Sequence, residues 1–201
     1  MNDTEAVIRP YVGADERAWL ECRVLAFLDT AYFDSVEREK EGYDRPSVEL
    51  VAEVDGRIVG LIDVECEDEP GTVCEDRPGL GGMIWHLAVL RDFRRRGIAT
   101  RLLTAAEDAV RAQGIKRFEA WTRDDPWVQG WYESRGFEQL FSYLHVYPHG
   151  PGEIEGALRS ELPGLKPVKV FAHYTGDRRD EIRSRFARVH DCVLYERRLP
   201  A

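Results

Sequence analysis

Apolar residues recur at intervals of three and four between residues 98 and 113, which is the spacing of one face of an α-helix. Gly114 follows directly, and glycine commonly ends a helix because it adopts the left-handed backbone conformation without a steric penalty. A segment at residues 19–28 shows the same spacing with Trp19, Val24 and Phe27. The pattern therefore predicts two amphipathic helices, each with one face packed on a sheet.

Other apolar runs predict strands around these helices. Residues 48–54 and 57–67 flank the dipeptide Asp55-Gly56, which supplies the positive φ angles of a two-residue hairpin turn. Further strands are expected at residues 6–10, 84–89, 117–121 and 137–147, a third helix at 127–135, and an acidic loop rich in glycine and proline at 67–82. The alternation of strands and helices indicates an α/β protein.

The periodic spacing of apolar residues is weaker after residue 147. The run PHGPG is followed by a strand-like segment at 168–174, a basic helical segment at 177–188 and a last strand at 189–197. About 50 residues bury too little apolar surface to form a second core alone. We therefore predict one domain, residues 1–147, with a C-terminal α/β extension, residues 148–201, that packs on the core or contributes to a homodimer.

The composition narrows the class of protein. Of 201 residues, 43% are hydrophobic and 32% are charged, and the formal net charge is −9. No apolar run approaches the roughly 20 residues of a membrane-spanning helix, so no membrane partner is expected. A negative charge disfavours a nucleic-acid partner, because phosphate binding relies on a cationic surface. A cationic or amine partner suits this charge better.

The cysteines and the N-terminal residues indicate the cellular compartment of the protein. Cys22, Cys66, Cys74 and Cys192 are scattered and form no C-x-x-C pair, so reduced structural thiols are expected. The first residues, MNDTE, have neither the basic nor the apolar region of a secretory signal. Both features predict a cytoplasmic protein.

An anion-binding pattern follows the apolar run at residues 84–89. The first N–H groups of a helix have no intrahelical partners, and here they stand beside three guanidinium groups and a glycine. Neither the dinucleotide pattern G-x-G-x-x-G nor the triphosphatase pattern G-x-x-x-x-G-K-[ST] occurs. A pyrophosphate site is predicted at Arg94, Arg95, Arg96, Gly97, Ile98, Ala99 and Thr100.

Two motifs in the right order carry a family resemblance. Arg94, Gly97 and Ala99 match the pattern Arg/Gln-x-x-Gly-x-Gly/Ala, and residues 131–137 (WYESRGF) match aromatic-Tyr-Glu-x-x-Gly-Phe. Together they resemble the GNAT acetyltransferase superfamily over roughly residues 8–141. The resemblance implies an α/β fold with a mixed, splayed central sheet flanked by helices. It also implies that acetyl-CoA serves as co-substrate and that no metal is needed.

The resemblance further implies where the coenzyme binds. Main-chain groups of Leu87, Ala88 and Val89 would pair with pantetheine, and an N–H there would polarise the thioester carbonyl; core packing explains the apolar side chains equally well. Tyr132 corresponds to the tyrosine that protonates the departing thiolate. Asp125 stands where the family commonly has a coenzyme-binding asparagine, although an ionised carboxylate accepts and cannot donate a hydrogen bond.

The general base is sought among the carboxylates of the predicted hairpin. Asp63 and Glu65 alternate with apolar residues, so both lie on one face of their strand. Glu65 is the preferred base, and the alternatives are a solvated strand-end carboxylate and catalysis through ordered water. His86 is expected to be structural, because strand parity sets it opposite Leu87.

Aromatic residues are candidates for the acceptor pocket. Trp85 shares a strand face with Leu87, while Tyr32 and Phe33 are assigned by resemblance to the family's variable loop; ordinary core packing explains all three equally well. Aromatic faces suit a cationic amine. His145 and His149 have the spacing H-x-x-x-H but straddle a strand end, so no metal site is expected.

The combined prediction is an N-acetyltransferase that moves an acetyl group from acetyl-CoA to an amine of a small molecule or protein by direct attack. Two alternatives stay open. One is a non-catalytic module that binds or senses acyl-CoA, and the other is an acyltransferase that uses a longer acyl-CoA. The presence of Tyr132 favours a catalyst over a sensor.

Overall fold

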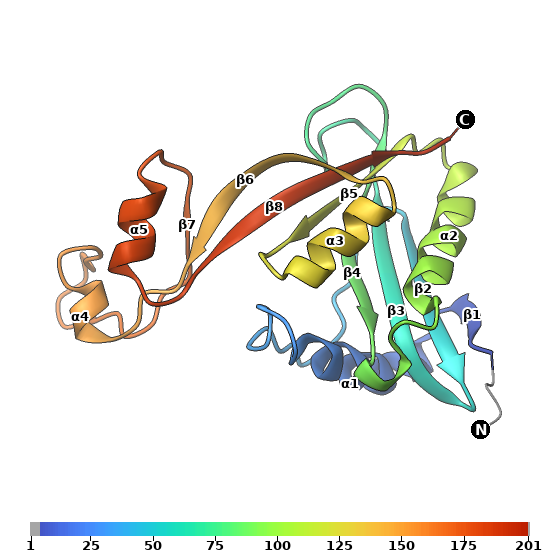
Figure 1. Ribbon diagram of the computed structural model, residues 1–201, viewed down its shortest axis with the longest axis horizontal. Coiled ribbons are helices and arrows are strands. Elements are labelled where there is room, and N and C mark those ends of the chain that lie inside the picture. Colours follow the sequence, from blue (N-terminus) through green and yellow to red (C-terminus); the bar gives the residue numbers. More distant parts are fainter. Residues whose placement is uncertain (1–4, 201) are drawn as a thin grey trace.

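The computed structural model describes residues 5–200; most of the N-terminal run MNDTE, on which the predicted location partly rests, lies outside this range. The described chain forms an eight-stranded mixed sheet with helices on both faces (Figure 1), which confirms the α/β class. No described helix combines the length and apolar character needed to cross a membrane. The elements are β1 (Val7–Pro10), η1 (Gly13–Asp15), α1 (Glu16–Phe27), β2 (Ser47–Val54), β3 (Arg57–Cys66), β4 (Gly81–Val89), η2 (Arg91–Phe93), α2 (Ile98–Arg111), β5 (Arg117–Thr122), α3 (Pro126–Ser134), β6 (Glu138–Val146), α4 (Gly150–Ile154), β7 (Ala172–Tyr174), α5 (Arg179–Arg185) and β8 (Val189–Arg198).

The strands follow the order β1-β2-β3-β4-β5-β8-β6-β7 across the sheet. β4 and β5 pair in parallel, and their neighbours pair antiparallel. The predicted hairpin is β2–β3, with Asp55 and Gly56 at positive φ angles. α2 packs closely on one face, where a Cβ at Gly60 would come within 3.1 Å of the Ile98 side chain. α1 covers the opposite face, where Trp19 contacts the His86 ring of β4.

The C-terminal strand lies inside the central sheet. β8 pairs antiparallel with β5 on one side and with β6 on the other. Residues 189–198 are therefore part of the core sheet, although they fall within the segment predicted as an extension, residues 148–201. The sequence pattern predicts the strand but not its neighbours, because the pairing of β8 with β5 joins segments that are far apart along the chain.

The segment that leaves the body of the protein is the connection between β6 and β8. We call residues 147–188 the arm; it carries α4, β7 and α5 at the far end of the long β6–β8 ribbon (Figure 1). A small separate cluster of Leu144, Val146 and Phe186, with Ile182 packed against it, holds the arm to the ribbon. The predicted basic helix is α5, which ends at Arg185.

Glu67 organises the acidic loop between β3 and β4. Its buried Oε1 accepts N–H groups of Gly71 (2.8 Å) and Cys74 (3.1 Å), and its Oε2 accepts that of Gly81 (2.7 Å). A guanidinium nitrogen of Arg117 lies 3.5 Å from Oε2. Burial alone would raise the pKa of Glu67, but the backbone donors and Arg117 hold that pKa below its usual value. The carboxylate therefore fixes the loop to the start of β4.

Replacing Glu67 by Gln should lower the free energy of unfolding by about 3 kcal/mol. An amide cannot accept hydrogen bonds at both positions, so buried N–H groups lose their partner. Urea unfolding at neutral pH measures the change. Glu69→Gln, an exposed neighbour in the same loop, is the matched control and should change stability by less than about 0.5 kcal/mol.

The same contribution should depend on pH. Because the folded-state pKa of Glu67 is lowered, its stabilisation is present at neutral pH and is lost as the pH falls through that pKa. The stability gap between the wild type and Glu67→Gln should therefore narrow in acid. A gap that stays constant down to about pH 3 would contradict this account of Glu67.

Candidate active site

The site begins where two strands separate. β4 and β5 are paired from Gly81 and Arg117 to Ile84 and Ala120, and β4 then continues to Val89 without a strand on that side. The gap opens into a cavity of about 1080 Å³ between α1 and α3. The main chain of Leu87, Ala88 and Val89, predicted to pair with pantetheine, lines this gap.

A bulge in β4 accompanies the separation. His86 is opposite Asp63 and Ile84 is opposite Val64, so Trp85 is an extra residue in the ladder. A bulge bends its strand and increases the local twist. Trp85 lines the cavity with 46% of its surface exposed, and its Nε1–H donates to Glu65 at 2.8 Å.

The backbone after β4 forms an anion cradle at the start of α2. Arg95 and Gly97 have positive φ angles, and the N–H of Arg101 donates to the Gly97 carbonyl in the first helical turn. The N–H groups of the preceding residues in the helix, Ile98 to Thr100, have no intrahelical acceptor. A Cβ on Gly97 would meet no described atom within 4 Å, so space for a ligand lies beside it. This arrangement fits the diphosphate of coenzyme A.

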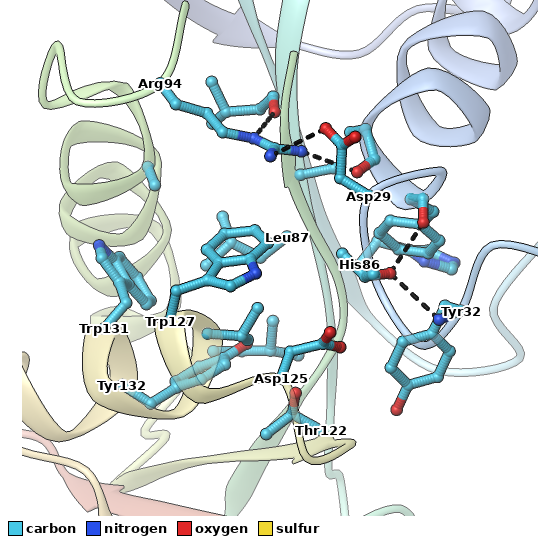
Figure 2. A pocket seen from close by; sticks show the side chains of 18 of the residues that line it. Asp29, Tyr32, His86, Leu87, Arg94, Thr122, Asp125, Trp127, Trp131 and Tyr132 are labelled. Atoms are coloured by element: carbon cyan, nitrogen blue, oxygen red, sulfur yellow. Dashed lines mark hydrogen bonds and ion pairs between the residues drawn. The ribbon is translucent and has the colours of Figure 1, made fainter. Parts of the chain in front are cut away.

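The three arginines of the cradle differ in their surroundings. Arg94 is engaged with the protein: it donates to the carbonyls of Val89 (3.1 Å) and Ala26 (2.8 Å) and pairs with Asp29 (3.1 Å), as Figure 2 shows in part. Its guanidinium also stacks on Trp127, 4.8 Å from the ring centre. Arg95 is exposed at the cavity rim, and Arg96 lies over a phenylalanine ring. Arg94 thus bridges α1, β4 and α3.

Tyr132 projects from α3 into the cavity wall (Figure 2). It is buried, stacks on Tyr195 with 5.8 Å between ring centres, and contacts Phe137 edge-on. Burial raises the pKa of Tyr132. The hydroxyl therefore stays protonated at neutral pH and can donate a hydrogen bond to a group in the cavity.

Asp125 lines the cavity but its carboxylate has a partner within the protein. Both oxygens accept the N–H of Ala31, at 3.1 and 2.9 Å. The side chain therefore ties the loop after α1 to the start of α3. A coenzyme contact of Asp125 stays a prediction.

Not all residues that the sequence predicted for amine binding and for proton removal line the cavity. Tyr32 lines the cavity beneath the guanidinium of Arg123, whereas Phe33 is half exposed outside it and lies under Arg188. Glu65 is buried and is not part of the cavity lining; it holds Trp85 instead. Its predicted role as base thus finds no support in this geometry.

Several lining residues were not predicted. They include Arg23, Asp29, His86 and Trp127. His86 and Tyr32 lie on the opposite side of the cavity from the α3 residues Trp127, Trp131 and Tyr132 (Figure 2). The predicted parity holds, because His86 pairs with Asp63 and Leu87 with the adjacent Ile62, so the two side chains point to opposite faces of the sheet. His86 still lines the cavity, because residues from both faces of β4 border the opening. Among the described residues, no group of three His, Cys, Asp or Glu side chains could hold a metal ion.

Comparison with known proteins agrees with this geometry. The sequence profile of the acetyltransferase (GNAT) family matches residues 14–137, more than half of the chain. The chain belongs to this family. It is an N-acetyltransferase whose general chemistry is acyl-CoA-dependent N-acyl transfer. An acetyltransferase of Pectobacterium atrosepticum is 33% identical over 140 residues, which cover 69% of this chain and 84% of that protein.

Solved structures share the fold of this GNAT acetyltransferase. The ribosomal-protein-S18-alanine N-acetyltransferase of Escherichia coli has a TM-score of 0.57 at 14% identity, covering 98% of this chain and 95% of its own. The PaiA N-acetyltransferase of Thermoplasma acidophilum, solved with coenzyme A, has a TM-score of 0.52 at 15% identity, covering 67% of this chain and 91% of its own. At these identities the likeness concerns the fold alone.

Gly97→Leu should weaken coenzyme A binding at least tenfold, or about 1.4 kcal/mol, because the side chain would enter the space beside the cradle. Isothermal titration calorimetry measures the affinity. Gly114→Leu is the matched control: Gly114 follows the other end of α2, has the same φ of 77°, and also has no described atom within 4 Å of its missing Cβ. The two variants share the backbone strain, so an equal loss of affinity in both would contradict the cradle.

Proposed function

We propose that this enzyme transfers an acetyl group from acetyl-CoA to a primary amine by direct attack in a ternary complex. The observation that carries the proposal is the arrangement around one cavity. The cradle at the start of α2, the main chain of β4 beyond its pairing with β5, and the protonated Tyr132 border it, and so do the aromatic residues Tyr32 and Trp85.

The pKa values of the amine and of the thiol define two tasks for the site, which are deprotonation of the amine and protonation of the departing sulfur. A lysine-like ammonium with a pKa of about 10.4 needs about 4.6 kcal/mol at pH 7 to present its free amine. A thiol with a cysteine-like pKa of about 8.5 leaves more readily, so a proton donor beside sulfur helps modestly. The buried Tyr132 supports the second task, and the first requires a proton acceptor or a desolvating pocket.

The acceptor is proposed to be an amine of a small molecule or of a protein. The aromatic faces of Tyr32 and Trp85 suit a cationic group, and the net charge of −9 suits a basic partner. One structural neighbour acts on an alanine of a ribosomal protein according to its name, which keeps proteins among the candidates. A cytoplasmic location and a homodimer, to which the arm would contribute, stay predictions.

Two measurements separate the proposal from its rivals. Release of coenzyme A is followed with a panel of amines, peptides and aminoglycosides, and with acetyl-, succinyl- and long-chain acyl-CoA as donors. Turnover with acetyl-CoA and an amine is expected. Tight binding without turnover on any acceptor would indicate a sensing module, and a preference for a longer donor would indicate a different acyltransferase.

Tyr132→Phe should lower kcat about tenfold and leave coenzyme binding intact, because the thiol is already a fair leaving group and only the proton donor is lost. Steady-state kinetics at saturating substrates measure the effect. Tyr195→Phe is the matched control, since its ring stacks on Tyr132 but its hydroxyl bonds to Glu133 at 3.0 Å, away from the cavity. Equal rates in wild type and Tyr132→Phe would exclude the acid role.

A further inference from the structure

The proposed reaction requires a base that removes a proton from the ammonium group of the substrate. Among the described residues that line the cavity, the side chains that could accept a proton during the reaction are the carboxylates of Asp29 and Asp125 and the imidazole of His86. Asp29 is engaged by Arg94, and Asp125 already accepts the Ala31 N–H. His86 also has partners on both ring nitrogens, but an imidazole is a stronger base than a carboxylate, which makes it the best candidate of the three.

The hydrogen bonds of His86 define its tautomer. The ring is 7% exposed and contacts Trp19 edge-on. Its Nε2 bonds to a carboxylate oxygen of Glu41, which can only accept while ionised, so Nε2 carries the hydrogen. Its Nδ1 accepts the Nε–H of Arg23, so Nδ1 carries a lone pair. A carboxylate on one nitrogen and a lone pair on the other is the arrangement of a general base.

Arg23 is held mainly by other groups. It donates to the Ser35 carbonyl at 2.8 Å, whereas its contact with His86 is long, at 3.4 Å. For Nδ1 to take up a proton the Arg23 Nε–H has to move off it, and the Ser35 anchor is separate from this long contact. Glu37 lies 3.9 Å from Arg23 and partly balances its charge.

The other charged groups near His86 lie on β3 and in the loop that precedes β2. Asp63, opposite His86 in the β3–β4 ladder, is fully buried and binds Lys40 at 2.8 Å and the Tyr43 hydroxyl at 3.0 Å. Glu41 is different, because 49% of its side chain is exposed. Its hydrogen bond with His86 lowers the pKa of Glu41, so the carboxylate is ionised at neutral pH. His86 and Glu41 thus connect the buried cavity wall to solvent.

We infer that His86 is the general base of this enzyme and that Glu41 is the positioning residue that orients its ring and passes the proton to water. The inference rests on the proposed function and adds the residue that presents the free amine. It replaces the prediction of Glu65, which lies outside the cavity lining.

The protons and electrons of the step balance. His86 Nδ1 takes one proton from the acceptor ammonium, and the freed lone pair of the amine forms the C–N bond at the thioester carbonyl while the C–S bond breaks. Sulfur leaves with the bonding pair and takes the Tyr132 hydroxyl proton. The new amide nitrogen gives its second proton to water, Tyr132 regains one from water, and His86 returns its proton through Glu41. One proton is released in total.

His86→Gln tests the role of the ring. With an alkylamine acceptor, kcat/KM should fall on the order of 10²-fold at neutral pH. With an acceptor that is already unprotonated at neutral pH, such as an alkoxyamine, the loss should be several-fold at most. His173→Gln, an exposed histidine of β7, is the matched control.

Two further measurements guard against misfolding. Calorimetry with coenzyme A should give wild-type affinity for His86→Gln, and added imidazole should restore part of the activity of His86→Ala. Equal losses with protonated and unprotonated acceptors would overturn the base role. A wild-type enzyme that turns over no amine would instead overturn the proposed function itself, so the two failures are distinguishable.

Glu41→Gln tests the positioning role. It should lower kcat about tenfold for the alkylamine and alter its pH profile, with KM for acetyl-CoA unchanged. Glu37→Gln is the control, because Glu37 lies in the same loop, has 51% of its side chain exposed, and contacts Arg23 rather than His86. Identical pH profiles for Glu41→Gln and Glu37→Gln would reject a role for Glu41.

Discussion

The site depends on the parting of β4 from β5 after Ile84. The two strands are held together at their other end, where Arg117 pairs with Gly81 and where Glu67 binds both Arg117 and the N–H of Gly81. The bulge at Trp85 then turns β4 away. A sheet that is fixed at one end and open at the other offers unpaired main-chain groups in its interior, and such groups require a partner.

The two walls of this gap are joined through one residue of the loop after α1. The N–H of Ala31 donates to Asp125 at the start of α3, and its carbonyl accepts Arg123 (2.5 Å) and Arg188 (3.1 Å). The two guanidinium groups alternate with aromatic rings: Arg188 stacks between Phe33 and Tyr147, and Arg123 lies over Tyr32. Through these contacts the base of the arm is packed against the side of the cavity that holds Tyr32.

Much of the architecture could be read from local patterns. The helix of residues 98–111, the hairpin at Asp55-Gly56 and the strand-to-helix cradle at Gly97 each depend on interactions between near neighbours in the chain, and all three appear in the structure. The surroundings of Glu65 and Phe33 could not be read from local patterns. Strand parity and loop position limited where these side chains could point, but an inserted residue in β4 and the path of the arm decided what they contact.

The resemblance to the family, the turn at Gly97 and the place of Tyr132 on a helix can be read from the chain alone, because each is encoded in a short run of residues whose backbone geometry is set locally. The tertiary structure decided that the last strand completes the sheet and that His86 borders the cavity between Arg23 and Glu41. Both outcomes depend on contacts between segments that are far apart in the chain. A pairing register and a bulge are properties of two strands together, so neither can be read from one strand alone.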